Sequence, residues 1–227
     1  MNDHERTRGT RSYVLRQGRM TAAQRRALET LLPTRAWPAT PVAPRAVTGR
    51  DAPLNLEIGT GDGENILAQA AARPHEDFIA CEVHGPGIGH LLLKAESLGL
   101  RNLWVAQRDA HELLSLLPAG SLTELCLFFP DPWPKTRHHK RRIFQRPLLD
   151  AARIALARHG RLRVASDIEA YADWVLEQLA LAPEWLNLAG PARCAPRLRA
   201  RVLTRFEARA RRDGRRVYDF ALTPRCG

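Results

Sequence analysis

Five short apolar runs divide the chain from residue 54 onward, and stretches with helical periodicity separate them. The runs cover residues 54–59, 77–83, 102–108, 122–129 and 161–167. Helices are expected after the first run to about residue 72, and over 86–98, 111–117, 146–158 and 169–181. Short apolar runs that alternate with helices are typical of a parallel sheet covered on both faces. The pattern therefore predicts an α/β fold with a mostly parallel sheet, and residues 201–207 and 215–224 are expected to add an antiparallel pair at its edge.

The chain before residue 54 differs in composition, because it is rich in arginine and proline. Residues 1–19 are basic and lack an apolar core, which favours a flexible arm. Thr21 and Gln24 fit the capping box of a short helix, and five prolines between residues 33 and 53 indicate an extended linker. The expected organisation is an arm at 1–19, a helix and linker at 20–53, and one domain at 54–227.

Charge narrows the class of partner. The formal net charge is +11, and the basic excess is concentrated in residues 1–26, 135–146 and 193–216. Basic segments gathered on one face attract a polyanion, and nucleic acid is the commonest one in the cytoplasm. The sequence has no apolar run of membrane length, and its four cysteines are widely spaced without histidines at ligand spacing. We therefore expect a cytoplasmic monomer that binds nucleic acid, with no membrane and no metal.

The stretch EIGTGDGEN follows the first apolar run and predicts a ligand site. Gly59 and Gly61 allow a tight turn that a ligand can approach without meeting a Cβ atom. Acidic residues stand at the ends of the first three runs, namely Glu57, Glu82 and Asp109. These ends border the ligand site of an open parallel sheet, and an acid at the second strand suits a ribose diol.

Two cofactor classes compete for this site. The nicotinamide fingerprint requires a third glycine where this chain has Glu64, and the carboxylates of Glu57 and Asp62 would repel a pyrophosphate. S-adenosylmethionine carries a sulfonium and an ammonium but no phosphate, so the same carboxylates favour it. We therefore expect S-adenosylmethionine as the cofactor.

The loop FFPDPWP after the fourth run is the expected floor for an acceptor base. Two prolines stiffen the backbone around Asp131, and Trp133 offers a face for stacking a base; a proline turn with a buried tryptophan is the alternative. Enzymes that methylate base amines often carry an Asn/Asp-Pro-Pro-aromatic loop, but here Trp133 replaces the second proline. Guanine N7 already has a free lone pair, so it needs no general base but only fixation, exposure and a negative group for the charge that develops on the purine. Asp131 would supply that group.

Several blocks of the chain match a known family in order. They are RSYVLRQGRMT, LEIGTGDGE, EVHGPGIG, DA at residue 109, LFFPDPWPKTRHHKRR, ASD and YA within residues 165–172, and TRFEARARRDGRRVYDF. Together they resemble the bacterial tRNA (guanine-N7-)-methyltransferase family, which modifies guanosine 46 in the tRNA variable loop. The resemblance covers nearly the whole chain beyond residue 10 and implies a Rossmann-like, seven-stranded class I methyltransferase fold with tRNA as partner.

The resemblance also implies roles for individual residues. Asp131 would be the catalytic residue. The cofactor would be bound by Glu57, Gly59, Gly61, Glu82, Asp109 and Asp131. The target guanosine would be held by Lys135, Asp167, Thr204, Arg205, Phe206 and Glu207. The tRNA backbone would be contacted by Arg137, His138, His139, Lys140, Arg141 and Arg142.

Simpler roles exist for some of these residues. Thr204 and Glu207 also match a capping box, and Asp167 could cap the helix that follows it. The chain departs from the family pattern at Asp62, Ala210, Arg215 and Tyr218. Two alternatives therefore stay open: a methyltransferase that acts on another RNA or on a base amine, and a catalytically weakened RNA-binding relative.

Overall fold

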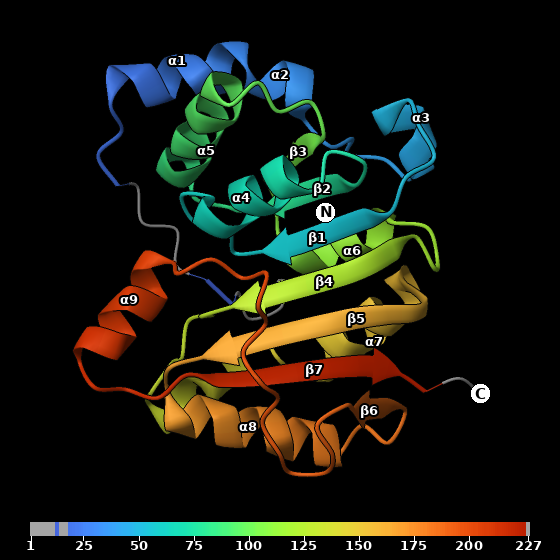
Figure 1. Cartoon of the computed structure of the whole chain (residues 1–227), viewed down its shortest axis with the longest axis vertical. Coiled ribbons are helices and arrows are strands. Elements are labelled where there is room, and N and C mark those ends of the chain that lie inside the picture. The colour runs from blue at the N-terminus through green and yellow to red at the C-terminus, as the bar shows by residue number, and fades with distance from the viewer. Residues whose placement is uncertain (1–11, 14–17, 226–227) are drawn as a thin grey trace, which may run out of the picture.

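The computed structural model describes residues 12–13 and 18–225 around a seven-stranded sheet. The strands are β1 (Leu54–Ile58), β2 (Asp77–Cys81), β3 (Leu103–Ala106), β4 (Leu122–Phe128), β5 (Leu156–Ser166), β6 (Trp185–Asn187) and β7 (Tyr218–Pro224). Their order across the sheet is β3-β2-β1-β4-β5-β7-β6. The first five strands pair in parallel, whereas β7 is antiparallel to both β5 and β6 (Figure 1). The predicted mostly parallel sheet with an antiparallel edge pair is confirmed.

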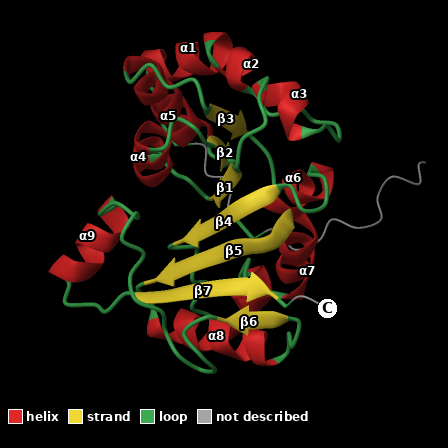
Figure 2. Cartoon of the chain, turned by 45° about the vertical axis from the view of Figure 1, so that its right-hand side comes forward, coloured by secondary structure: helices red, strands yellow, loops and turns green. Residues whose placement is uncertain are grey.

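Helices cover both faces of this sheet (Figure 2). They are α1 (Ala22–Thr30), α2 (Leu32–Arg35), α3 (Pro44–Thr48), α4 (Glu64–Ala72), α5 (Gly85–Ser97), α6 (Ala110–Leu116), the 3-10 helix η1 (Thr136–Arg141), α7 (Arg146–Ala155), α8 (Glu169–Ala180) and α9 (Arg205–Arg212). On one face α4 and α5 bury residues such as Leu67 and Leu91, and on the other α6, α7 and α8 bury Leu113, Leu149 and Val175. Within the described residues, no helix is both long enough and apolar enough to cross a membrane.

The two cores explain why the sequence pattern of the strands is so apolar. Successive residues of β2 alternate between the faces, so Phe78 joins the core under α4 and α5 while Ile79 joins the core under α6 and α7. Both residues are at most 2% exposed. A strand that is covered on both sides is mostly apolar, and the runs at 54–59 and 77–83 follow this pattern apart from Asn55, Glu57, Asp77 and Glu82.

The structure differs from the prediction at the edge of the sheet. Residues 201–207 form no strand; Thr204 Oγ1 accepts a hydrogen bond from the Glu207 N–H at 3.3 Å, and α9 begins at the next residue, Arg205. The antiparallel partner of β7 is instead β6, which is three residues long. The capping alternative for Thr204 was therefore right, and the strand prediction was wrong.

The helix predicted at 146–158 also ends three residues early. α7 stops at Ala155 because Leu156 already lies in β5, opposite Leu122 of β4. The hydrogen bonds of the sheet therefore replace those of the helix from this point.

The segment before β1 is anchored to the β3 edge of the sheet. The predicted capping box of α1 is present, with reciprocal hydrogen bonds between Thr21 and Gln24. Residues 33–53 include the short helices α2 and α3, and Trp37 is only 1% exposed. The Trp37 N–H donates to the carbonyl of Val105 in β3 at 2.8 Å. The arm predicted at 1–19 lies largely outside the described residues.

Candidate active site

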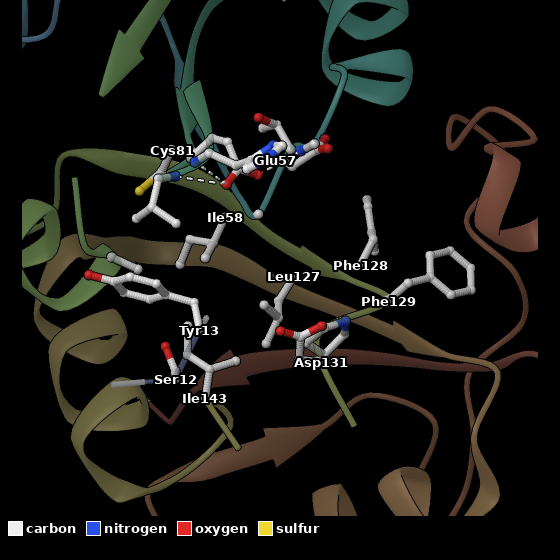
Figure 3. Close-up of a pocket in the computed structure, with 18 of the residues that line it drawn as sticks. Ser12, Tyr13, Glu57, Ile58, Cys81, Leu127, Phe128, Phe129, Asp131 and Ile143 are labelled. Atoms are coloured by element: carbon white, nitrogen blue, oxygen red, sulfur yellow. Dashed lines mark hydrogen bonds between the residues drawn. The ribbon is translucent and has the colours of Figure 1, made fainter. Parts of the chain in front are cut away.

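A cavity of about 750 Å³ opens beyond the carboxyl ends of β1, β2 and β4. At this edge β1 lies between β2 and β4, so the order of strands reverses here, which is where open α/β sheets bind ligands. Its wall combines Ser12 and Tyr13 with the glycine turn after β1, the loop after β4 and the start of α9. Figure 3 shows Glu57 above and Asp131 below the same space in that view.

Glu57 forms the floor of the glycine turn. Its side chain is 7% exposed, and Oε2 accepts a hydrogen bond from Asn65 Nδ2 at 2.6 Å. Burial raises the pKa of the Glu57 carboxyl to about 7, although the hydrogen bond from Asn65 opposes the shift. The turn above it needs glycine, because Gly59, Gly61 and Gly63 all have positive φ. A buried carboxyl group near its titration point is suited to meeting a cationic ligand.

The other two strand-end acids also line the cavity. Glu82 Oε2 accepts a hydrogen bond from the Gly61 N–H at 2.8 Å, so the second strand fixes the glycine turn. Asp109 accepts from the His111 N–H at 2.8 Å and thereby caps α6. Glu82 Oε1 also accepts from the Val83 and His84 N–H groups at 2.7 Å and 2.9 Å, so both lone pairs of that oxygen are used and one lone pair of Oε2 remains for a ligand. Glu57, Glu82 and Asp109 are therefore brought together as expected, while their contacts with a cofactor stay a prediction.

Asp131 lies in a loop with an unusual backbone. Phe129 has φ 51° and Trp133 has φ 42°, values that residues other than glycine rarely adopt. Asp131 and Trp133 both line the cavity, and the indole N–H of Trp133 donates to the Ser12 carbonyl at 3.1 Å. The Arg141 guanidinium lies 4.7 Å from the centre of the Trp133 ring. The Arg141 guanidinium therefore already occupies one face of the Trp133 indole.

Three of the predicted guanosine-binding residues reach the cavity. Thr204, Arg205 and Phe206 line it, and the Phe206 ring stacks on Phe129 with a centroid distance of 6.3 Å. Phe206 is 59% exposed. The start of α9 and the loop after β4 thus present adjacent aromatic rings at the cavity.

The structure does not bring Lys135, Asp167 or Glu207 to the cavity wall. Lys135 is exposed just before η1, and Asp167 forms an ion pair with Arg215. Glu207 is fully buried and accepts from arginine side chains, including Arg197 Nε at 2.7 Å. Direct contact between these three residues and a target base stays a prediction.

Three neighbouring arginines, of which Arg201 is buried, favour the ionised form of Glu207. Burial alone would raise the pKa of its carboxyl, but the hydrogen bond from Arg197, the charge of Arg201 and the hydrogen bond from Arg211 lower the pKa overall. Arg201, 1% exposed, also donates to Asp219 Oδ2 at 3.1 Å, so it joins α9 to β7. This network fixes the orientation of α9 beside the cavity.

The basic run divides into exposed and buried members. Arg137 and Lys140 are exposed, whereas His138, His139 and Arg141 are partly covered. Within the described part of the chain, no ion pair joins any of these side chains to a carboxylate. Partial burial and the neighbouring cations lower the pKa of His138, which favours its neutral form.

Arg142 is not at the surface. It is 3% exposed, donates from Nε to the Pro132 carbonyl at 2.9 Å, and lies over the rings of Tyr171 and Trp174. Arg142 therefore supports the Asp131 loop, and its guanidinium cannot contact a phosphate unless the side chain moves to the surface.

Sequence reasoning missed two residues near the site. Asn65 is 4% exposed and bridges Glu57 to the Val202 N–H. Its signal was a polar residue on the buried side of ENILAQA, with Gln69 four positions later. Arg201 gave no signal, because nothing in an arginine-rich segment distinguishes a buried arginine from an exposed one.

Comparisons with known proteins agree on one family. A sequence model of the family described as "Putative methyltransferase" matches residues 51–220. A tRNA (guanine-N(7)-)-methyltransferase of Chromohalobacter salexigens is 49% identical over 93% of this chain and 88% of its own. The protein of the same name from Leifsonia xyli is 44% identical over 94% and 95% of the two chains.

Solved structures support the fold alone. The structure of an antibiotic-related methyltransferase covers 86% of this chain and 98% of its own, with a TM-score of 0.57 and 14% identity. The 16S rRNA methyltransferase KamB covers 80% of this chain and 92% of its own, with a TM-score of 0.57 and 17% identity. The predicted class I methyltransferase fold is confirmed by these likenesses.

Proposed function

The chain belongs to the tRNA (guanine-N(7)-)-methyltransferase family, and from this we propose that it methylates N7 of guanosine 46 in tRNA with S-adenosylmethionine as the methyl donor. The observation that carries the proposal is the convergence of three strand-end acids and Asp131 on one cavity. A tRNA substrate implies that the enzyme acts in the cytoplasm.

The residues of the cavity fit this donor. A volume of about 750 Å³ is within the range of small-molecule sites. Thr60 in the glycine turn lines the cavity, and its buried hydroxyl has no hydrogen-bond partner among the described residues. The Glu57 carboxylate can pair with the ammonium group of the donor, and Glu82 can accept hydrogen bonds from its ribose diol. Asp109 lines the same cavity after β3. When bound, S-adenosylmethionine supplies an electrophilic methyl group on a positively charged sulfur.

Asp131 serves the acceptor side of the reaction. With a donor bound, the lone pair of guanine N7 would form the bond to the methyl carbon as the bond from that carbon to sulfur breaks, so no residue would have to remove a proton. The purine would gain the positive charge that the sulfur loses, and the Asp131 carboxylate beside the ring would stabilise it. The two prolines and the left-handed residues on either side hold Asp131 in place, so positioning costs little during the reaction.

The exposed basic residues of η1 and the start of α9 serve tRNA binding in this proposal. Thr204, Arg205 and Phe206 stand where a target base enters, and the Phe206 ring is free to stack on it. Arg137, Lys140 and Arg141 follow the Asp131 loop and supply phosphate contacts.

The test is incubation of the purified protein with labelled S-adenosylmethionine and unmodified tRNA. Borohydride reduction followed by aniline cleavage breaks the chain at 7-methylguanosine, so the expected result is a single cut in the variable loop. Label in tRNA without a cut would point to another atom, such as a base amine. Cofactor binding without any transfer would point to a weakened RNA-binding protein, and either result overturns the proposal.

A further inference from the structure

Side-chain contacts tie the glycine turn and α4 to residues 200–205, which lead into α9. Two contacts come from buried amide side chains: Gln69 donates to the Ala200 carbonyl, and Asn65 Oδ1 accepts from the Val202 N–H at 3.2 Å. Two more come from carboxylates: Glu64 Oε2 accepts from the Arg205 N–H at 2.7 Å, and Asp62 pairs with the Arg205 guanidinium. The partners are between 131 and 143 residues apart in sequence. We call these contacts the α4 clasp.

Asn65 is the buried centre of the clasp. Its Nδ2 donates to Glu57 Oε2 at 2.6 Å, and its Oδ1 accepts from the Val202 N–H at 3.2 Å. A carboxylate only accepts and an amide N–H only donates, so a single orientation of the Asn65 side chain satisfies both neighbours. The Asn65 amide group is therefore hydrogen-bonded to Glu57 in the donor pocket and to the backbone that precedes α9.

The far end of the clasp is the part of the chain that meets the target. Val202 is two residues before Thr204, which caps α9, and the Arg205 N–H is one of the first amides of that helix. Glu64 accepts from this amide and so caps α9 from another helix. Thr204, Arg205 and Phe206 line the cavity. Movement at Val202 would therefore move the residues proposed to hold the guanosine.

We propose that Asn65 is a positioning residue that transmits occupancy of the donor pocket to the target-binding start of α9, so that bound donor strengthens tRNA binding. The inference rests on the proposed function. A cationic ligand beside Glu57 keeps that carboxylate ionised, and an ionised acceptor forms a stronger hydrogen bond with Asn65. The Asn65 amide is then held more firmly toward Val202, and the start of α9 has less freedom left to lose when the target binds.

The experiment measures the coupling directly. The dissociation constant of unmodified tRNA is determined with and without saturating S-adenosylhomocysteine, the unreactive product, by fluorescence anisotropy. For the unaltered protein we expect tRNA to bind at least about fivefold more tightly when the product is present. In Asn65→Ala the ratio should fall to about one.

A matched control separates positioning from stability. Asn55 is 5% exposed and donates to Glu76 at 2.8 Å, but it lies at the opposite end of β1 and does not line the cavity. Asn55→Ala should lower the melting temperature and keep the coupling ratio of the unaltered protein. If Asn65→Ala fails to fold, Glu64→Ala tests the same clasp from a partly exposed position and should reduce the ratio.

The outcomes distinguish this inference from the proposed function. A ratio of one in the unaltered protein, or an unchanged ratio in a folded Asn65→Ala variant, overturns the role of Asn65 even if methyl transfer is normal. A loss of coupling in Asn55→Ala equal to that in Asn65→Ala would show a general loss of packing and would also overturn it. Absence of methyl transfer to N7 in the unaltered protein overturns the proposed function instead.

Discussion

Glu57 shows how a single buried group can serve a cofactor site. The fold places its carboxyl under the glycine turn with one hydrogen-bond donor, Asn65, and its pKa rises to about 7. Charging this group in the empty site costs free energy, because the protein interior solvates a carboxylate less well than water. A positively charged ligand can recover that cost. A buried carboxylate of this kind lowers the stability of the free protein and raises its affinity for a cationic ligand.

The pH dependence of stability should reveal this exchange. The pKa of Glu57 is about 7 in the folded protein and near 4.5 in the unfolded chain. The folded state therefore binds more protons in this interval, and the contribution of Glu57 to stability is lost as pH rises through it. Glu57→Gln should remove this loss and stabilise the free protein near pH 8 by up to about 3 kcal/mol, measured by urea unfolding.

The control for this measurement is Glu112→Gln, because the Glu112 side chain is 59% exposed. It should keep the pH dependence of the unaltered protein. Equal curves for Glu57→Gln and the unaltered protein would contradict the assignment.

Asp131 is expected to act through its charge. Asp131→Asn keeps the shape of the side chain but removes the negative charge beside the purine, so methyl transfer should fall about 100-fold or more. The affinity for S-adenosylhomocysteine should stay within several-fold, measured by calorimetry. A variant that transfers methyl groups at the normal rate would remove Asp131 from the reaction.

At the scale of elements, the short helix η1 combines a binding surface with a support. Arg137 and Lys140 point away from the fold, while Arg142, directly after η1, is buried under the Asp131 loop. The sequence KTRHHKRR does not separate these roles, because every position except Thr136 is basic or imidazole. The three-dimensional path of the backbone decides which cation faces solvent.

Substitution should separate the two roles. Replacing Arg137, Lys140 and Arg141 together with Ala should weaken tRNA binding and lower the slope of log Kd against log salt by about 2 to 3, because fewer counterions are released. Arg142→Ala should leave the slope nearly unchanged and lower the free energy of unfolding by about 2 kcal/mol or more. A large change of slope in Arg142→Ala would show that this side chain leaves its buried position to bind RNA.

The elements of the fold differed in how far sequence predicted them. The strands around the cavity were predictable because strands covered on both faces are mostly apolar, as in LNLEI and DFIAC, where the polar residues are Asn55, Glu57 and Asp77. β6 has only three residues and gave no periodic signal. Residues 201–207 alternate enough to suggest a strand, but the Thr204 cap and a buried Glu207 made a helix the better solution. The strand-end acids were predictable from position, whereas the bridge made by Asn65 depends on a contact with Val202, which is 137 residues away.

At the scale of the whole molecule, the net charge of +11 is distributed less simply than the sequence suggests. Much of the basic segment 193–216 is engaged internally, as in the pairs of Arg197 with Glu207 and Arg215 with Asp167. The run at 137–141 has no carboxylate partner within the described residues, and it follows directly on the Asp131 loop. One cationic run that a polyanion can meet therefore follows the cavity loop, where it can steer tRNA toward the residues proposed to react.

The hydrogen bond from Trp133 to the Ser12 carbonyl has a practical consequence for anyone who shortens this protein. Ser12 and Tyr13 lie more than 40 residues before β1, yet they supply part of the chamber that we propose for the reaction. A truncation that starts after Tyr13 would leave the seven strands complete and the chain foldable. It would also open a gap in the chamber beside the tryptophan, and bulk water would enter next to the reacting groups.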